Sequence, residues 1–393
     1  MNKNILNTGI QLFITKNLNT DISSLLLKGV HLDGVSPKEV AQQIEAKKKT
    51  KKKLPTWFNS KQIYYPNKLN IEQTSSEETA QYKSKIIKGK TLVDITGGFG
   101  VDTYYFAKKF ETVIHCEINK ELAEIAAHNF KILNTKNIHA IHQNGVAFLE
   151  ESKKHFDVIF LDPSRRDASK NKVFLLHDCE PDILKILPFL LKKSNLVLMK
   201  TSPLIDLSKS IEDLRHVKEI HIVAVNNEVK ELLWLLGPNA GTDIQIKTVN
   251  MLNEGSQCLN FAWQEESANI ATFSVPEKYL YEPNAAVLKS GAFNILTQKF
   301  AVSKLHPNTH LYTSNHKIDF PGRGFIIKEI LPYNKKILKK ALPGNKANIT
   351  TRNFPESVAQ IRKKTGIKDG GDIYLFFCTN FNNEKIVISA KKT

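Results

Sequence analysis

A glycine-rich turn is the segment of the sequence best suited to bind a ligand. It reads Val93-Asp94-Ile95-Thr96-Gly97-Gly98-Phe99-Gly100-Val101-Asp102 and joins a short apolar run to the stretch TYYFAKKF. Glycines at a strand-to-helix turn let the backbone approach a ligand and leave the helix N-terminus open to an electron-rich group. The nicotinamide fingerprint GxGxxG would need a glycine where the chain has Thr103, and the phosphate-loop pattern GxxxxGK[ST] is absent. The turn therefore predicts a cofactor site of another kind.

Four polar side chains stand at the ends of successive apolar runs. They are Asp94, Glu117, Asn144 and Asp162. The carboxyl ends of parallel strands form the ligand-binding edge of an open sheet, so we expect these side chains to lie together. At this edge the Glu117 carboxylate can bind the two ribose hydroxyls of an adenosine, and Asn144 is placed to contact the adenine.

The elements that must position these residues are short apolar runs that alternate with helical stretches. The runs are TLVDI, TVIHCE, IHAIH, FDVIFLD, NLVLMK and EIHIVAV. This alternation predicts an α/β fold with a doubly wound, mostly parallel sheet. A last run, Gln257 to Trp263, follows without a long helix and is expected to form an antiparallel edge strand.

Smaller elements are predicted on both sides of this sheet. The residues before it show helical spacing, with Ser36 as an N-cap and Pro37 at the first helical position. After the sheet, a helix is expected from Pro283 through AAVLKSGAFNIL, and a later one from Pro355 to a cap at Gly366. The C-terminal part therefore predicts a compact α/β module.

The glycine turn and the strand-end residues resemble those of class I S-adenosylmethionine-dependent methyltransferases. The family pattern, an acidic residue followed by GxGxG, is matched with Thr96 in place of the first glycine. The variant DxTxGxG followed by an aspartate is similar to that of bacterial small-subunit ribosomal-RNA base methyltransferases. The resemblance implies a Rossmann-like sheet and S-adenosylmethionine as cofactor. The residues that it implies for cofactor binding are Asp94, Thr96, Gly97, Gly98, Gly100, Asp102, Glu117 and Asn144.

The chemistry that the resemblance implies centres on Asp162. Methyl transfer from a sulfonium is an in-line displacement, so the enzyme mainly orients the nucleophile. Methyltransferases that act on exocyclic amines use a D/N-P-P-aromatic turn, whose side-chain oxygen and backbone carbonyl accept the amine hydrogens. Here Asp162 and the Pro163 carbonyl can accept them, although Ser164 and Arg165 replace the second proline and the aromatic residue. The alternative is that Asp162 only caps the next turn.

Lys200 is a second candidate catalytic residue. It ends the fifth apolar run. Together with Asp162 and a later acid such as Glu228, it is similar to part of the lysine–aspartate–lysine–glutamate set of 2′-O-ribose methyltransferases. Ribose methylation therefore stays open beside base methylation. Cysteine-based methylation of pyrimidines is disfavoured, because neither Cys179 nor Cys258 stands in the required setting.

The net charge of +17 is concentrated in the two flanks of the chain. Residues 1–90 carry 16 lysines against 7 acids, and residues 275–393 carry 20 basic residues against 8 acids. The segment between them has 20 against 24. Basic flanks on a slightly acidic centre indicate that the flanks meet a polyanion, for which nucleic acid is the leading candidate. The alternative is that a run such as Lys47 to Lys53 is a solvated helix face.

The C-terminal residues YLYEPNAAVLKSGAF, PGRGF, TTRNFP and KDGGDIYL resemble the ferredoxin-like and THUMP-like modules of a group of bacterial methyltransferases. THUMP domains are similar to RNA-binding modules of tRNA-modifying enzymes, so this resemblance implies an RNA substrate. Arginines and lysines there and after Asp162 are candidate phosphate contacts, with surface solvation or internal ion pairing as the alternative. These candidates are Arg165, Arg166, Arg323, Arg352, Arg362 and Lys363.

Several classes of protein are disfavoured by what the sequence lacks. The four cysteines are widely spaced and the histidines show no HExxH spacing, so neither a disulfide framework nor a metal site is expected. No apolar run is long enough to span a membrane. The sequence thus predicts a cytoplasmic protein, and it leaves the oligomeric state open.

We therefore expect a cytoplasmic methyltransferase acting on a base of ribosomal or transfer RNA. The alternatives are a 2′-O-ribose, small-molecule or protein methyltransferase, and an RNA-binding protein with a degenerate cofactor fold. The expected domains are a helical one at 1–85, the methyltransferase at 86–270, a ferredoxin-like connector at 275–317 and a THUMP-like domain at 318–393.

Overall fold

The computed structural model describes residues 1–27, 32–165, 176–238 and 240–393. The chain forms two compact units, which are described separately below. Unit 1 comprises Met1–Val217 and Leu233–Ala240, and unit 2 comprises Lys218–Leu232 and Gly241–Thr393. Among the described residues, no helix combines the length and the apolar character needed to cross a membrane.

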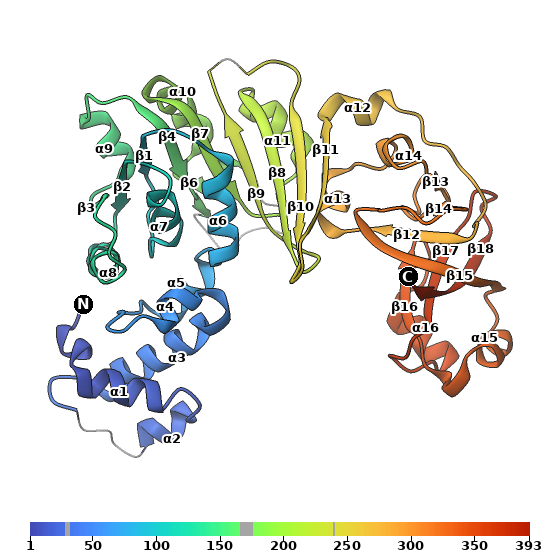
Figure 1. The fold of residues 1–393 in the computed structure, drawn as a ribbon, viewed down its shortest axis with the longest axis horizontal. Coiled ribbons are helices and arrows are strands. Elements are labelled where there is room, and N and C mark those ends of the chain that lie inside the picture. The colour runs from blue at the N-terminus through green and yellow to red at the C-terminus, as the bar shows by residue number, and fades with distance from the viewer. Residues whose placement is uncertain (28–31, 166–175, 239) are drawn as a thin grey trace. The chain divides into compact units, whose positions relative to one another are not determined.

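The N-terminal part of unit 1 is helical (Figure 1). Its helices are η1 (Lys3–Leu6), α1 (Thr8–Lys16), α2 (Ile22–Leu27), α3 (Pro37–Lys53), α4 (Pro55–Asn59), α5 (Lys68–Gln73) and α6 (Glu77–Ile86). Ser36 and Glu39 form a capping box at the start of α3, with Pro37 in its first turn, as predicted. The lysine run therefore forms the end of a regular helix.

These helices share a hydrophobic core with the first two helices of the sheet. The buried cluster contains Val40, Ile44 and Trp57 from the N-terminal part together with Tyr104 and Phe130. The rings of Trp57 and Tyr104 meet edge to face at 4.9 Å. The N-terminal helices are thus packed onto the sheet domain and do not close a core of their own.

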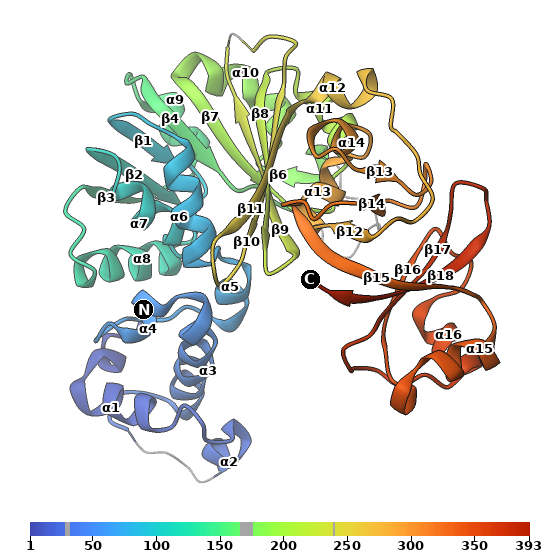
Figure 2. The ribbon, with the colours of Figure 1, turned by 45° about the vertical axis from the view of Figure 1, so that its right-hand side comes forward.

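The central element is a nine-stranded sheet that confirms the predicted α/β class (Figures 1 and 2). Its order is β11-β10-β8-β9-β7-β4-β1-β2-β3. The chain runs through β1 (Thr91–Asp94), α7 (Val101–Ala107), β2 (Thr112–Glu117), α8 (Lys120–Ile132), β3 (Ile138–His142), α9 (Gly145–Glu151), β4 (Phe156–Leu161), α10 (Ile183–Lys193), β7 (Ser194–Thr201) and α11 (Leu207–Leu214). Strands β3, β2, β1, β4 and β7 are parallel neighbours. The order reverses direction between β1 and β4, which is where such sheets bind ligands.

The far side of this sheet holds two strands that the sequence pattern did not predict. They are β9 (Glu228–Leu236) and β10 (Gln245–Met251), which follow β8 (Val217–Val225). The expected antiparallel edge strand is present as β11 (Ser256–Ala262), paired with β10 and followed by α12 (Trp263–Ala268). Two short strands, β5 (Ser164–Arg165) and β6 (Cys179–Glu180), pair separately, and η2 (Leu176–Asp178) precedes β6.

The C-terminal part of unit 2 is built on a seven-stranded sheet of order β13-β14-β12-β15-β18-β17-β16. Its strands are β12 (Tyr279–Pro283), β13 (Ser303–Lys304), β14 (Tyr312–Ser314), β15 (Gly322–Pro332), β16 (Asn348–Arg352), β17 (Tyr374–Thr379) and β18 (Lys385–Lys392). Its helices are α13 (Ala285–Ser290), α14 (Ile295–Lys299), α15 (Lys335–Ala341), η3 (Pro343–Asn345) and α16 (Val358–Thr365).

Two helix predictions in this region are wrong in detail. The helix expected from Pro283 is split into α13 and α14, because Gly291 caps α13 in a left-handed conformation with φ 75°. Helix α16 begins at Val358 instead of Pro355, because Ser357 accepts a hydrogen bond from the Gln360 backbone and so fixes the N-cap. The predicted cap at Gly366 is confirmed.

Candidate functional site

The glycine turn lies between β1 and α7, and its three glycines have different surroundings. A Cβ atom at Gly97 would lie 2.2 Å from the His115 ring, and one at Gly100 would lie 2.4 Å from the Phe130 ring. At Gly98, with φ +56°, the nearest atom would be 3.9 Å away. Gly97 and Gly100 are therefore required by packing, whereas Gly98 leaves room for a ligand against the backbone.

Asp94 lies beneath this turn with only 1% of its surface exposed. Its carboxylate accepts hydrogen bonds from Thr96 N at 3.1 Å and from the Thr103 hydroxyl at 2.7 Å. Burial raises the pKa of Asp94 to about 8, and it lowers the pKa of His115, which contacts the same hydroxyl, to about 3. The structure thus places Asp94 beneath the turn, where its hydrogen bonds to Thr96 and Thr103 hold the turn in place.

Thr96, which stands where the family has a glycine, links two strand ends. Its hydroxyl accepts a hydrogen bond of 2.7 Å from the backbone N–H of Asp162, which follows β4. The backbone N–H of Ile95 also donates to Phe160 O at 3.0 Å. The side chain at position 96 therefore fixes the glycine turn against the turn that carries Asp162.

Glu117, at the end of β2, reaches back to the glycine turn. Its carboxylate accepts hydrogen bonds from Gly98 N at 2.8 Å and from Asn119 N at 2.7 Å. The next residue, Ile118, is 67% exposed although it is large and apolar. An exposed apolar side chain beside the glycine turn fits a flat apolar ligand group. Ile118 was not predicted from the sequence, although its position directly after Glu117 was a usable signal.

Asn144 lies at the end of β3 and caps α9. Its side-chain oxygen accepts hydrogen bonds from Val146 N at 2.9 Å and Ala147 N at 3.1 Å. The residue itself is exposed. The oxygen is therefore engaged with the helix, and the side-chain amide N–H groups are what Asn144 can offer to a ligand.

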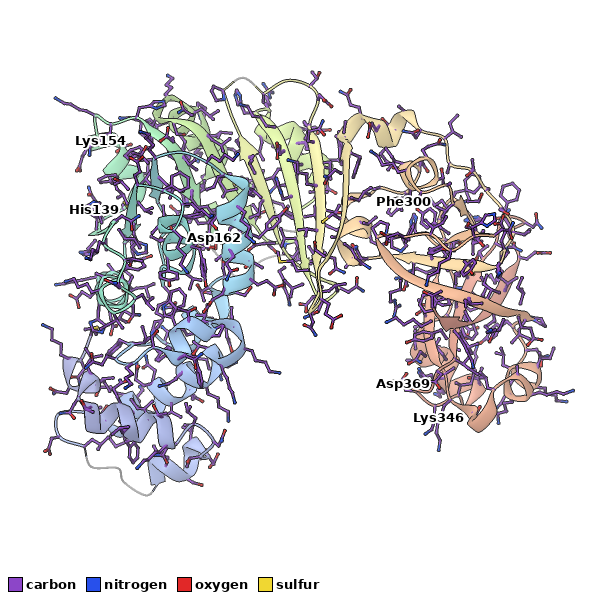
Figure 3. The ribbon with its side chains drawn as sticks, in the orientation of Figure 1. His139, Lys154, Asp162, Phe300, Lys346 and Asp369 are labelled. Carbon is purple, nitrogen blue, oxygen red and sulfur yellow. The ribbon has the colours of Figure 1, made fainter. Side chains whose placement is uncertain are left out.

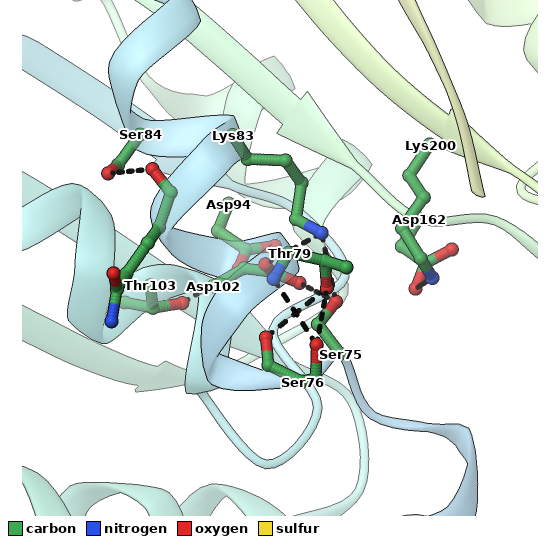
Figure 4. Close-up of polar contacts among 11 residues, drawn as sticks. Ser75, Ser76, Thr79, Lys83, Ser84, Asp94, Asp102, Thr103, Asp162 and Lys200 are labelled. Atoms are coloured by element: carbon green, nitrogen blue, oxygen red, sulfur yellow. Dashed lines mark hydrogen bonds and ion pairs between the residues drawn. The ribbon is translucent and has the colours of Figure 1, made fainter. Parts of the chain in front are cut away.

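Asp102 belongs to a buried polar network that includes residues from before the sheet (Figure 4). The Lys83 ammonium lies 3.2 Å from Asp102 Oδ1, and Ser75 donates a hydrogen bond of 2.7 Å to Asp102 Oδ2. Lys83 also donates to Ser75 at 3.1 Å, and its side chain is 0% exposed. Ser75 precedes α6 and Lys83 lies in it, so the N-terminal helices contribute directly to the glycine turn. In the sequence, Lys83 is one lysine among many in a basic flank, and nothing marked it.

Asp162, labelled in Figure 3, forms a second ion pair at the same edge of the sheet with Lys200 (Figure 4). They follow β4 and end β7, and their side chains are 32% and 15% exposed. Pro163 is buried beside them. The structure therefore brings together the two polar residues that the sequence singled out for catalysis. Arg165 pairs through its backbone with Cys179, and Arg166 lies outside the described residues.

The candidate RNA contacts of the C-terminal part differ in how many contacts their side chains already make within the protein. Arg323 and Arg352 both bind the carboxylate of Glu282. Arg362 pairs with Asp369 and donates to two backbone carbonyls, whereas Lys363 is exposed. Over the described ranges, no group of histidine, cysteine or acidic residues is arranged to hold a metal ion.

Comparison with known proteins matches three segments of the chain to known families. Residues 89–239 match the family described as RNA cap guanine-N2 methyltransferase, residues 279–321 a ferredoxin-like domain, and residues 322–392 a THUMP domain-like family. The solved structure of a putative methyltransferase from Porphyromonas gingivalis W83 is 34% identical with a TM-score of 0.90, covering 100% of this chain and 98% of that one.

Two curated relatives are named as uncharacterized RNA methyltransferases. The protein from Mycoplasma mobile is 28% identical over 35% of this chain, and the one from Clostridium acetobutylicum is 29% identical over 29% of it. The chain spans only 39% and 26% of the lengths of these relatives. Together the matches confirm the predicted resemblance to methyltransferases that carry ferredoxin-like and THUMP-like modules.

Proposed function

The chain belongs to the same family as the Porphyromonas gingivalis protein, and from this premise we propose that it is an S-adenosylmethionine-dependent enzyme that methylates RNA. One observation carries the proposal: Gly98, Glu117 and the Asp162–Lys200 pair stand at the ends of neighbouring strands where the sheet order reverses. The names of the curated relatives and the THUMP-like match support RNA as the substrate.

The residues around the glycine turn fit the cofactor. Gly98 has open space at its backbone, Ile118 offers an exposed apolar surface for the adenine, and Glu117 offers a carboxylate for the ribose. Asp102 Oδ1 is paired with the buried Lys83 ammonium at 3.2 Å, so Asp102 would support the cofactor by holding the turn. Asn144 would contact the adenine edge through its amide N–H groups. When bound, S-adenosylmethionine would supply an activated methyl group to a well-oriented nucleophile, with S-adenosylhomocysteine as the leaving group.

The substrate side of the site is formed by Asp162, Pro163 and Lys200. The Lys200 ammonium forms an ion pair with the Asp162 carboxylate and so fixes the position of this hydrogen-bond acceptor. Asp162 and the Pro163 carbonyl would accept the hydrogens of an exocyclic amine and hold its nitrogen toward the cofactor. The enzyme thus acts chiefly by orientation, with a base of ribosomal or transfer RNA as the proposed target.

Ribose 2′-O-methylation is the second candidate, favoured by one observation. The contact between Lys200 and Asp162 is the kind of pair that would position and polarise a hydroxyl group. Mass spectrometry of nucleosides from RNA methylated by the enzyme separates the candidates, because a ribose product carries its extra mass on the sugar fragment.

The first test of the proposal is calorimetric titration of S-adenosylmethionine into the wild type and a Glu117→Ala variant. We expect the wild type to bind the cofactor. The affinity of the variant should be about tenfold lower or more, because the proposed hydrogen bonds from the two ribose hydroxyls to the Glu117 carboxylate disappear. Glu111→Ala is the matched control, since Glu111 is an exposed acid directly before β2 that pairs with Lys90. Failure of the wild type to bind the cofactor would leave an RNA-binding protein with a degenerate cofactor fold.

We place this activity in the cytoplasm. The support is that all four cysteines are free thiols, as expected in a reducing compartment.

A further inference from the structure

One acidic residue and two arginines meet in the C-terminal sheet of unit 2. Glu282 lies in β12 and stands opposite Arg323 of the neighbouring strand β15. Arg352 ends β16, which is separated from β12 by β15, β18 and β17 in the sheet order (Figure 2). The three residues, which we call the Glu282 cluster, thus come from strands that are not all neighbours.

Each oxygen of the Glu282 carboxylate is bound by a different arginine. Oε2 accepts from Arg323 Nε at 2.9 Å and also from Nη2, and Oε1 accepts from Arg352 Nη2 at 2.8 Å. The Glu282 side chain is 4% exposed, whereas those of Arg323 and Arg352 are 39% and 34% exposed. The carboxylate therefore forms the buried base of the cluster, and the two guanidinium groups reach the surface.

The cluster carries one positive charge more than the carboxylate needs for neutralisation. A donor group also remains: Arg323 Nη1 has no acceptor in the described part of the chain, whereas Arg352 Nε, which also has none, is buried. Arg352 Nη1 makes only a long contact of 3.4 Å with Thr351 O. Two guanidinium groups with fixed planes and free N–H groups match the oxygens of a phosphate.

Among the neighbouring groups, Lys304 adds to the positive potential and His310 does not. Lys304 is 2% exposed, and its ammonium donates to the Pro307 carbonyl at 2.7 Å. Burial, followed by the charges of Lys304 and Arg352, lowers the pKa of His310 to about 4, so this histidine stays neutral and adds no charge at neutral pH. The acid that acts on Lys304, Glu266, already has its carboxylate bound to the backbone N–H groups at the start of α14.

We propose that the Glu282 cluster is a phosphate-binding site in which the buried carboxylate orients Arg323 and Arg352 toward one phosphate group of the RNA backbone. This inference rests on the proposed RNA substrate and adds a defined contact far along the chain from the cofactor turn. Phosphate contacts of this kind fix the register of an RNA without reading its sequence.

The competing explanation is that the two arginines serve only to hold the strands of the sheet together through Glu282. That role would require their side chains to matter for stability and not for RNA. A substitution of arginine by lysine separates these cases further, because lysine keeps the charge but cannot supply two parallel N–H donors in a fixed plane.

The test uses the full-length protein and a fluorescein-labelled single-stranded RNA of mixed sequence. Anisotropy titrations from about 50 to about 200 mM salt compare the wild type with Arg323→Met, Arg352→Met and Arg323→Lys. Lys340→Met is the matched control, since it removes one exposed charge from α15 in the same unit. Thermal unfolding of each variant, and calorimetric binding of S-adenosylmethionine, show whether the fold and the cofactor site persist.

We expect each Arg→Met variant to bind the RNA about tenfold more weakly and to lower the slope of log affinity against log salt by about 1. Arg323→Lys should recover little of the lost affinity, and Lys340→Met should match the wild type. Wild-type affinity and slope in folded Arg→Met variants would overturn the proposal, as would full rescue by lysine, which indicates a diffuse charge effect. If an Arg→Met variant does not fold, Glu282→Gln takes its place. Weaker RNA binding by Glu282→Gln would support the proposal that the carboxylate orients the arginines. Stronger binding would show that only the net charge of the cluster matters, and would contradict it.

Inorganic phosphate, titrated into the wild type and Arg352→Met, separates two sources of the same group. Binding of free phosphate together with unchanged RNA affinity in the variants would contradict the assignment to RNA. Loss of RNA affinity with intact cofactor binding supports it. If instead the wild type bound neither the cofactor nor RNA, the proposed function would fail as a whole, which is a different outcome.

Discussion

Two lysine–aspartate pairs stand at the same edge of the large sheet and differ in their access to water. Lys83 and Asp102 have side chains that are 0% and 11% exposed, and Ser75 completes their contacts. Lys200 and Asp162 are 15% and 32% exposed. A buried pair cannot exchange its partners without a large cost, whereas a partly exposed pair can give up water for a substrate. The first pair is therefore suited to hold the cofactor turn, and the second to meet the reacting group.

The largest effect expected from this comparison is on stability. Lys83→Met should lower the free energy of unfolding by about 3–5 kcal/mol, because it leaves the Asp102 carboxylate buried without its cation. Urea denaturation measures this change. Lys85→Met, on the exposed side of the same helix, is the control and should cost less than about 0.5 kcal/mol. Equal costs for the two variants would show that the buried pair has no special role.

The partly exposed pair, Asp162 and Lys200, should matter more for activity than for stability. Asp162→Ala should slow methyl transfer about 100-fold, because the nucleophile loses the side-chain acceptor that orients it. Its cost in unfolding free energy should stay below about 1 kcal/mol, since the pair is partly solvated. Single-turnover methylation and urea denaturation measure the two effects. The contrast between the pairs would break down if Asp162→Ala destabilised the protein as much as Lys83→Met.

Asp94 extends the comparison, because it lies beside the two pairs and no cation among the described residues is paired with it. Burial, with smaller contributions from the charges of Asp102 and Asp162, raises its pKa to about 8. A raised folded-state pKa means that the stability linked to this group is present below the unfolded value of 3.8 and is lost as the pH rises toward 8. The wild type should lose up to about 1.4 kcal/mol per pH unit in this range.

Asp94→Asn tests this expectation. The amide stays neutral, so the stability of the variant relative to the wild type should rise with pH. Its oxygen can still accept from Thr96 N, while its amide group donates to the Thr103 hydroxyl. Unfolding free energies measured from pH 5 upward check the slope. A constant difference between the two proteins would mean that Asp94 is ionised in the folded state.

The smallest expected effect concerns Ile118, which belongs to neither pair. Ile118→Ala should weaken cofactor binding by about 1–2 kcal/mol through lost apolar contact. Its exposed side chain should make the change nearly neutral for stability, within about 0.5 kcal/mol. Calorimetry and urea denaturation together check both parts. A stability loss larger than the affinity loss would show that Ile118 packs against the protein.

The sequence predicted the parallel sheet and its ligand-binding edge because strand ends and turns are local patterns. The pairing of Asp162 with Lys200 was also within reach, since both residues end strands that a doubly wound sheet places close together. The burial of Asp94 and the link from Thr96 to Asp162 N were not, because they depend on how the turn folds back on the sheet.

Other features depend on contacts between residues far apart in the chain. Lys83 is one of 16 lysines in the first 90 residues, and only the fold shows that it is buried. Arg323 and Arg352 were predicted as phosphate contacts, but their common partner Glu282 has no sequence signal that links it to them. Strands β9 and β10 were missed because no helix separates β8 from β9 or β10 from β11 to mark the alternation.

The core shared by the N-terminal helices and the sheet has a consequence for synthesis. Trp57, Ile44 and Val40 pack against residues up to Phe130, so their partners emerge from the ribosome well after them. Domains usually fold in order as they emerge. Here the first helices must wait, with apolar surface uncovered, until α8 has been translated. We therefore expect nascent chains that end before α8 to be protease-sensitive, and those that extend past β4 to be protected.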